Sequence, residues 1–146
     1  MTAGPVAALG SVARRTLAAW DRFWFTPRPA STYVLWRGAL GFTATAWLVS
    51  LAWDLQTFYG EVGIRPSPSY ADHRLGLFQW WESDTVLWAV YLVSLAAAVA
   101  VTVGRFVRVA APVLFLGVVS FQFDNTSVLN AGDNLLRIWC AYLALF

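Results

Sequence analysis

The sequence of 146 residues has few of the side chains that metal sites, redox sites and nucleic-acid surfaces need. It contains one cysteine, one histidine and no lysine, and charged residues make up only 12% of the chain. A single cysteine, Cys140, excludes an internal disulfide and a cysteine-based zinc motif, and His73 alone is no metal site. The net charge of +2 comes from scattered arginines, without the basic stripe that a phosphate backbone requires. The composition therefore predicts no metal, no cofactor and no nucleic-acid partner.

Apolar and aromatic side chains are present in excess. Hydrophobic residues make up 59% of the chain and aromatic residues 16%, and the mean hydropathy is +0.58. Soluble domains carry about 25% charged residues, and a soluble core of this size could not hide so much apolar surface. We therefore expect an all-α integral membrane protein in contact with the lipid bilayer.

Four hydrophobic segments predict three to four transmembrane helices. The clearest, at 85–104, has no charged residue and would extend about 30 Å as a helix, which matches the hydrocarbon layer. We expect two further spans at about 33–54 and 108–123, the latter a short one. A fourth apolar helix begins at 134 and reaches 146 without a capping signal. We expect it to be incomplete, and the chain to be a fragment of a larger multi-helix bundle.

The N-terminal residues 1–32 predict an interfacial amphipathic helix on the cytoplasmic side. The segment SVARRTLAAWDRFWF is interrupted by charges, so it does not fit a secretion signal. Its apolar side chains fall near one helical face, with the charged ones around the other side. These apolar residues are Val12, Leu17, Trp20, Phe23 and Trp24.

The distribution of arginines predicts the topology. Four arginines precede the first span, and Arg105 and Arg108 lie in the turn between the second and third. Because cytoplasmic loops carry an excess of arginine and lysine, we expect a multi-pass protein of the cell membrane with a cytoplasmic N-terminus. The 57–83 loop and the 124–132 segment are then outside. The aromatic residues of the loop indicate either an interfacial belt or a short amphipathic lid, RLGLFQWW, over an outward cavity.

Polar residues concentrate in FDNTSVLNAGDNLLRIWC, residues 123–140. Asp133 would lie in the first turn of the last helix, where a carboxylate faces the positive end of the helix dipole. Arg137, four residues later, is on the same face, so we expect the two to pair. Asp54 could approach this region, whereas Arg37 is expected to reach toward the cytoplasmic interface. Two interpretations remain open: an outer turn with a helix anchor, or an outward polar pocket between helices. The pocket candidates are Asp124, Asn125, Asn130, Asp133, Asn134 and Arg137; no catalytic residue can be named.

Three motifs carry a resemblance to a known family. FWFTPRPASTYVLWRGALG, VTVGRF and above all SFQFDNTSVLNAGDNLLRI resemble the HTTM domain, a bacterial membrane domain related to the vitamin K-dependent gamma-carboxylase. The resemblance covers roughly residues 21–146 and implies that the chain is the N-terminal half of the domain. It would place Asn125 and Ala131 where the carboxylase has an important lysine and histidine, and it would keep Asn130.

Because this chain has neither the lysine nor the histidine at these two positions, two functions are expected. In the first, the protein is a non-carboxylating HTTM protein whose outer pocket binds or helps process a peptide or lipid-like partner. Its bacterial relatives would include a protein that matures a peptide toxin. In the second, it is a membrane enzyme related to the carboxylase, with active groups partly outside this fragment.

Overall fold

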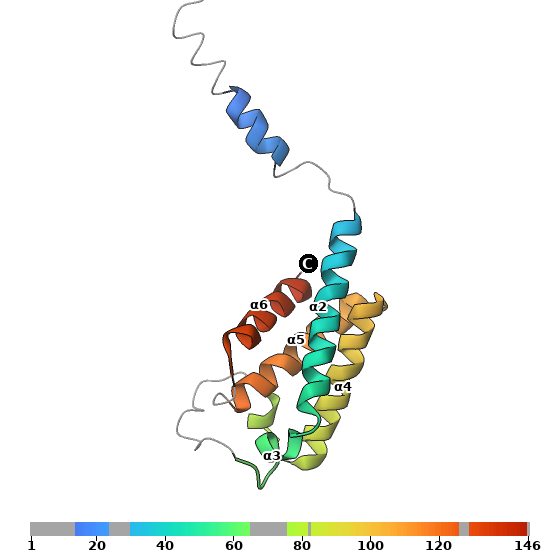
Figure 1. Ribbon diagram of the computed structural model, residues 1–146, viewed down its shortest axis with the longest axis vertical. Coiled ribbons are helices and arrows are strands. Elements are labelled where there is room, and N and C mark those ends of the chain that lie inside the picture. The colour runs from blue at the N-terminus through green and yellow to red at the C-terminus, as the bar shows by residue number, and fades with distance from the viewer. Residues whose placement is uncertain (1–13, 24–29, 65–75, 82, 126–128, 146) are drawn as a thin grey trace, which may run out of the picture. The chain divides into compact units, whose positions relative to one another are not determined.

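The computed structural model describes residues 14–23, 30–64, 76–81, 83–125 and 129–145 (Figure 1). Contacts within the chain divide it into two units, residues 1–32 and 33–146. The described residues are helical or in turns and loops, and none of them is in a strand. The expected all-α class is therefore confirmed.

The first unit contains the expected N-terminal helix, at residues 14–23. Leu17, Trp20 and Phe23 are each more than 60% exposed, and their spacing of three residues places them near one face. Val12 and Trp24, which were expected on the same face, lie outside the described residues.

The second unit is a bundle of helices. Its elements are α2 (Ala30–Leu51), α3 (Leu55–Tyr59), the 3-10 helix η2 (Leu77–Gln79), α4 (Asp84–Val103), α5 (Val107–Asp124) and α6 (Ala131–Leu145). Three of them, α2, α4 and α5, are long and apolar enough to cross a membrane, as the sequence predicted. The chain is therefore a helical membrane protein.

The observed helix bounds differ from the predicted spans by a few residues. The first predicted span, 33–54, is shifted: α2 starts at Ala30 and ends at Leu51, because residues 52–54 form a turn that leads into α3. The two middle spans each differ by about one residue at either end. The last helix begins at Ala131 instead of residue 134 because Asn130 already provides its N-terminal cap.

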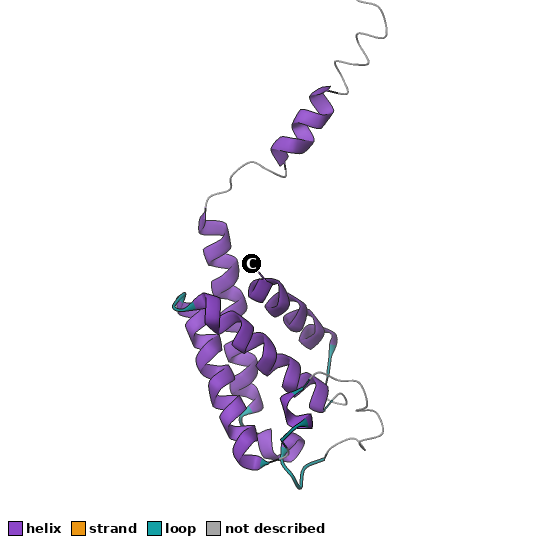
Figure 2. Ribbon diagram, turned by 180° about the vertical axis from the view of Figure 1, so that it is seen from behind, coloured by secondary structure: helices purple, strands orange, loops and turns teal. Residues whose placement is uncertain are grey.

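Helix α5 lies between α4 and α6 (Figures 1 and 2). Small residues allow the helices to approach closely, as is usual in membrane bundles. A Cβ on Gly41 of α2 would lie 2.6 Å from the backbone nitrogen of Thr102 in α4, and a Cβ on Gly117 of α5 would lie 2.8 Å from the Cβ of Ser94. Neither glycine can be enlarged without moving a helix.

An aromatic cluster forms the core at the α3 end of the bundle. Phe121 of α5 is fully buried, and its ring meets the rings of Trp47, Tyr59 and Phe78 edge-on, at centroid distances of 6.4, 5.3 and 5.1 Å. Tyr59 and Phe78 therefore belong to the core and not to an interfacial belt. Among the described aromatic residues of the loop, the belt interpretation suits Trp80 and Trp81, which are 78% and 62% exposed.

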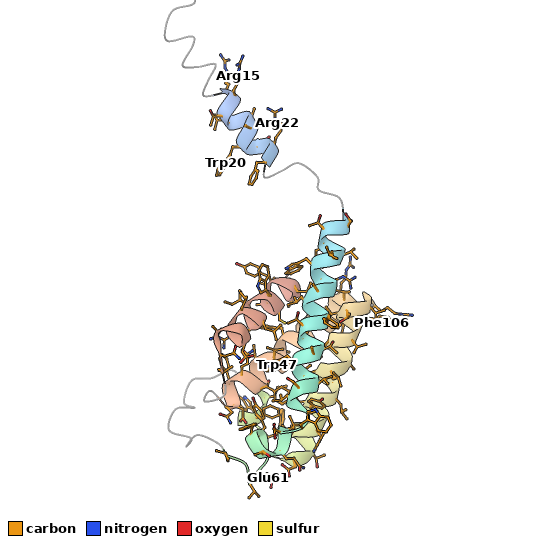
Figure 3. All side chains as sticks on the ribbon, viewed as in Figure 1. Arg15, Trp20, Arg22, Trp47, Glu61 and Phe106 are labelled. Carbon is orange, nitrogen blue, oxygen red and sulfur yellow. The ribbon has the colours of Figure 1, made fainter. Side chains whose placement is uncertain are left out.

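The turn between α4 and α5 uses two residues in the left-handed conformation. Gly104 has φ 86° and ends α4, with its N–H donating to the Ala100 carbonyl. Phe106, with φ 53°, precedes α5 although it is not a glycine. Its side chain is 78% exposed and projects away from the bundle (Figure 3).

Candidate functional site

A cavity of about 260 Å³ opens at the end of the bundle where α2 finishes and α6 starts. We call it the acidic-end cavity. Its walls come from the last turn of α2, the following turn, α3, and the segment that leads into α6. The lining residues are Trp47, Ser50, Leu51, Asp54, Phe58, Tyr59, Leu129, Asn130 and Asp133.

Asn130 and Asp133 form a reciprocal cap at the start of α6. The Asp133 N–H donates to Oδ1 of Asn130 at 3.1 Å, and the Asn130 N–H donates to Oδ2 of Asp133 at 2.9 Å. This capping box satisfies two backbone donors that a helix start leaves open. It also holds the Asp133 carboxylate, 8% exposed, in the cavity wall.

Gln122 of α5 forms a hydrogen bond to the start of α6. Its Nε2 donates to the Asp133 carbonyl at 2.8 Å, and its side chain is completely buried. Its Oε1 has no hydrogen-bond partner among the described residues. Sequence reasoning missed Gln122, although it is the only amide side chain in the apolar segment between Arg108 and Asp124.

Asn125 acts as a clamp on the loop that follows α3. It is 2% exposed, and its Nδ2 donates to the carbonyls of Phe58 and Ile64, both at 3.1 Å. The loop is further fastened to α4, because the N–H of Glu61 donates to Asp84 Oδ1 and the N–H of Asp84 donates to Glu61 Oε1. Asn125 therefore positions Phe58 in the cavity wall without lining the cavity itself.

The prediction that Asp133 and Arg137 form an ion pair is wrong. The carboxylate of Asp133 is engaged with the Asn130 backbone, and the Arg137 guanidinium donates to Asn134 Oδ1 at 2.9 Å. The same guanidinium lies 5.0 Å from the ring centre of Phe123, a cation–π distance. Spacing places the two residues near one face, but each side chain finds a closer partner.

The six predicted pocket residues therefore separate into three groups. Asn130 and Asp133 line the acidic-end cavity, and Asp54 joins them there, as expected from the sequence. Asn134 is exposed, and Arg137 lines a separate, mainly apolar cavity against η2 and α5. Asn125 is the clamp, and Asp124 is half-buried at the end of α5, next to it.

The aromatic wall of the cavity was not predicted as part of a site. Trp47 comes from α2 (Figure 3), and Phe58 and Tyr59 come from α3. Burial raises the pKa of the Tyr59 hydroxyl, and the carboxylates of Asp124 and Asp133 raise it further. Tyr59 therefore keeps its proton and can donate a hydrogen bond but cannot act as a base.

The predicted lid does not cover this cavity in the part that the structure describes. Residues 65–75, which include the first two residues of the predicted lid, lie outside the described residues. Leu77 of η2 instead packs on α5, where its N–H donates to Ser120 Oγ at 3.1 Å, and Gly76, Leu77 and Trp80 line the apolar cavity of Arg137.

The fold and the cavity define a class: a helical membrane protein with an acidic, aromatic-walled cavity at one end of its bundle. Comparison with protein-family models, with curated proteins and with solved structures finds no match.

Proposed function

We propose that the protein is a non-carboxylating membrane protein of the HTTM type, whose acidic-end cavity binds a peptide or lipid-like partner through a cationic group. The observation that carries this proposal is the convergence of Asp54 and Asp133 on a cavity walled by Trp47, Phe58 and Tyr59. A cation would meet two carboxylates and the faces or edges of aromatic rings, the combination that binds amines and guanidinium groups.

The carboxylates of the cavity are not neutralised by an arginine in the part of the chain that the structure describes. Asp54 is exposed and makes no cap hydrogen bond to α3. Asp133 uses Oδ2 for the Asn130 N–H, and no described residue donates to its Oδ1. A positively charged partner would supply the missing counter-charge.

The charge asymmetry of the bundle supports an outward orientation of the cavity. The described acidic residues of the second unit all lie at the cavity end of their helices; they are Asp54, Glu61, Asp84, Asp124 and Asp133. Of the described arginines of this unit, Arg37, Arg105 and Arg108 lie at the opposite end, and Arg137 lies in the second turn of α6. Because arginine-rich ends stay in the cytoplasm, the proposal places the acidic-end cavity at the outer face, where it would meet an exported peptide or an outer-leaflet headgroup.

The carboxylase-like alternative would need the lysine and histidine that the resemblance assigns to that enzyme. No lysine or histidine lines the described walls of the cavity, and Tyr59 holds its proton. We therefore place binding ahead of catalysis.

The proposal is tested with a pair of synthetic peptides that differ only in one side chain, arginine in the first and its neutral isostere citrulline in the second. Titration against the detergent-solubilised protein should show about tenfold tighter binding of the arginine peptide, as expected for one charge-assisted hydrogen bond. Asp54→Asn should remove this preference, whereas Glu61→Gln, an exposed acid at the same end that does not line the cavity, should keep it. Phosphoethanolamine, an amine headgroup, is the lipid-like probe in the same assay. Equal binding of both peptides, with no binding of phosphoethanolamine, would contradict the proposal.

A further inference from the structure

The opposite end of the bundle holds a second cavity, of about 580 Å³, which we call the arginine-end cavity. Tyr33 and Arg37 come from α2, Gly104 and Arg108 flank the α4–α5 turn, and the last turn of α6, Leu143–Leu145, completes the wall. It shares no lining residue with the acidic-end cavity. Two guanidinium groups and one phenol thus converge where the ends of α2, α4, α5 and α6 meet.

Arg37 is held in place by the end of α4. Its side chain is 8% exposed, and its Nη1 donates to the Val101 carbonyl. A Cβ on Gly104 would lie 2.5 Å from its Nη2, so the guanidinium fills the space that the glycine leaves open. The sequence predicts that Arg37 extends to the cytoplasmic interface, and this prediction is wrong. Arg37 instead caps the negative end of the α4 dipole.

This cap uses only part of the hydrogen-bonding capacity of Arg37. A guanidinium has five N–H donors, and the described residues accept one bond from it. No described carboxylate forms an ion pair with Arg37 or Arg108, and the described acids of this unit lie at the other end of the bundle. A buried cation without a counter-ion is unfavourable, so the cavity is suited to an anion.

We propose that the arginine-end cavity binds a phosphate group, with the fixed fork of Arg37 as the main contact and Arg108 as the second charge. A planar guanidinium matches two phosphate oxygens, and the Tyr33 hydroxyl can donate to a third. The surface next to the cavity favours a phospholipid as the source: Val103, Phe106 and Val109 are each at least 65% exposed, which offers apolar surface to acyl chains. Basic pockets between helices at a cytoplasmic face are suited to anionic headgroups.

Native mass spectrometry of protein released from mixed vesicles of phosphatidylglycerol and phosphatidylcholine tests the proposal. The wild type should retain phosphatidylglycerol in preference to phosphatidylcholine. Arg108→Gln should lower this retention about tenfold, the effect of losing a charge-assisted contact. Arg105→Gln is the matched control, since Arg105 is exposed in the same turn but does not line the cavity.

Two further arms complete the test. Arg37→Lys keeps the charge but loses the fork, so it should weaken retention while the protein stays folded by circular dichroism. Inorganic phosphate is then added to delipidated protein. If the phosphate group alone is recognised, it should raise the unfolding temperature of the wild type but not that of Arg108→Gln. Stabilisation by phosphatidylglycerol only would assign the site to the intact lipid. Equal retention of both lipids together with no response to phosphate, or an equal loss in Arg105→Gln and Arg108→Gln, would overturn the proposal.

Discussion

The capping box at the start of α6 can be separated from the pairing of charges on the same helix by a double-mutant cycle. Asn130→Ala removes the acceptor for the Asp133 N–H, and loss of an N-cap side chain costs about 1 kcal/mol. Asp133→Ala removes the acceptor for the Asn130 N–H, and because Asn130 is exposed the loss is that of one ordinary hydrogen bond, about 0.5 to 1.5 kcal/mol. Because both hydrogen bonds fix the same turn, we expect the double variant to lose less than the sum, with a coupling of at least about 0.5 kcal/mol.

Unfolding of each variant in mixed micelles, followed by circular dichroism, gives the four free energies that the cycle requires. Asp133→Asn is the control, since an amide oxygen can still accept from the Asn130 N–H. The same cycle with Arg137→Ala should be additive with Asp133→Ala within about 0.5 kcal/mol, because Arg137 contacts Asn134 and Phe123 instead. A larger coupling of Asp133 with Arg137 than with Asn130 would refute the assignment of partners.

Three further substitutions and one matched control test the packing and the electrostatics. Gly41→Ala should destabilise the bundle by about 1 to 3 kcal/mol through contact with the α4 backbone, whereas Gly38→Ala, whose Cβ would meet its nearest atom at 3.9 Å, should be neutral or slightly stabilising by thermal unfolding. Phe121→Ala should cost about 3 to 5 kcal/mol, because it empties the centre of the aromatic cluster; a loss below about 1 kcal/mol would show that the cluster is not core. In the folded protein the pKa of Tyr59 is raised above its unfolded value of 10.0. The contribution of the protonated phenol to stability is therefore fully present below pH 10 and is lost as the pH rises through the folded pKa. Tyr59→Phe should therefore flatten the fall in stability above pH 10, and an unchanged slope would contradict the shift.

The helices of this protein follow from the sequence because they depend on local properties. Uncharged stretches predicted α4 and α5 to within about one residue, and Gly104 marked the turn between them. The sequence also predicted correctly that Asp133 lies in the first turn of the last helix, because it lies just before the apolar run. The largest errors in the helix bounds were three residues, at both ends of α2 and at the start of α6. At the end of α2 the prediction was too long, since Trp53 and Asp54 are compatible with either a helix or a turn.

The site was less predictable because it depends on contacts between distant segments. Asn125 bonds to Phe58, 67 residues earlier, and no local pattern indicates that α3 would form a cavity wall. The choice of partners for Asp133 and Arg137 depends on side-chain rotamers and not on spacing. Arg37 was misjudged for a related reason: its partner is a carbonyl at the end of another helix, which has no signature in the sequence.

The central claim, that Asp54 and Asp133 make the acidic-end cavity electronegative, is tested most directly by charged thiol reagents at one engineered cysteine. Ser50 lines the cavity and is exposed, and the native Cys140 is buried in α6, so Ser50→Cys in a Cys140→Ala background provides a single reactive thiol. A methanethiosulfonate reagent that carries an ammonium group should react faster than one that carries a sulfonate. Asp54→Asn should reduce this rate ratio, while Glu61→Gln should leave it unchanged. A ratio that favours the sulfonate, or one that does not respond to Asp54→Asn, would contradict the account.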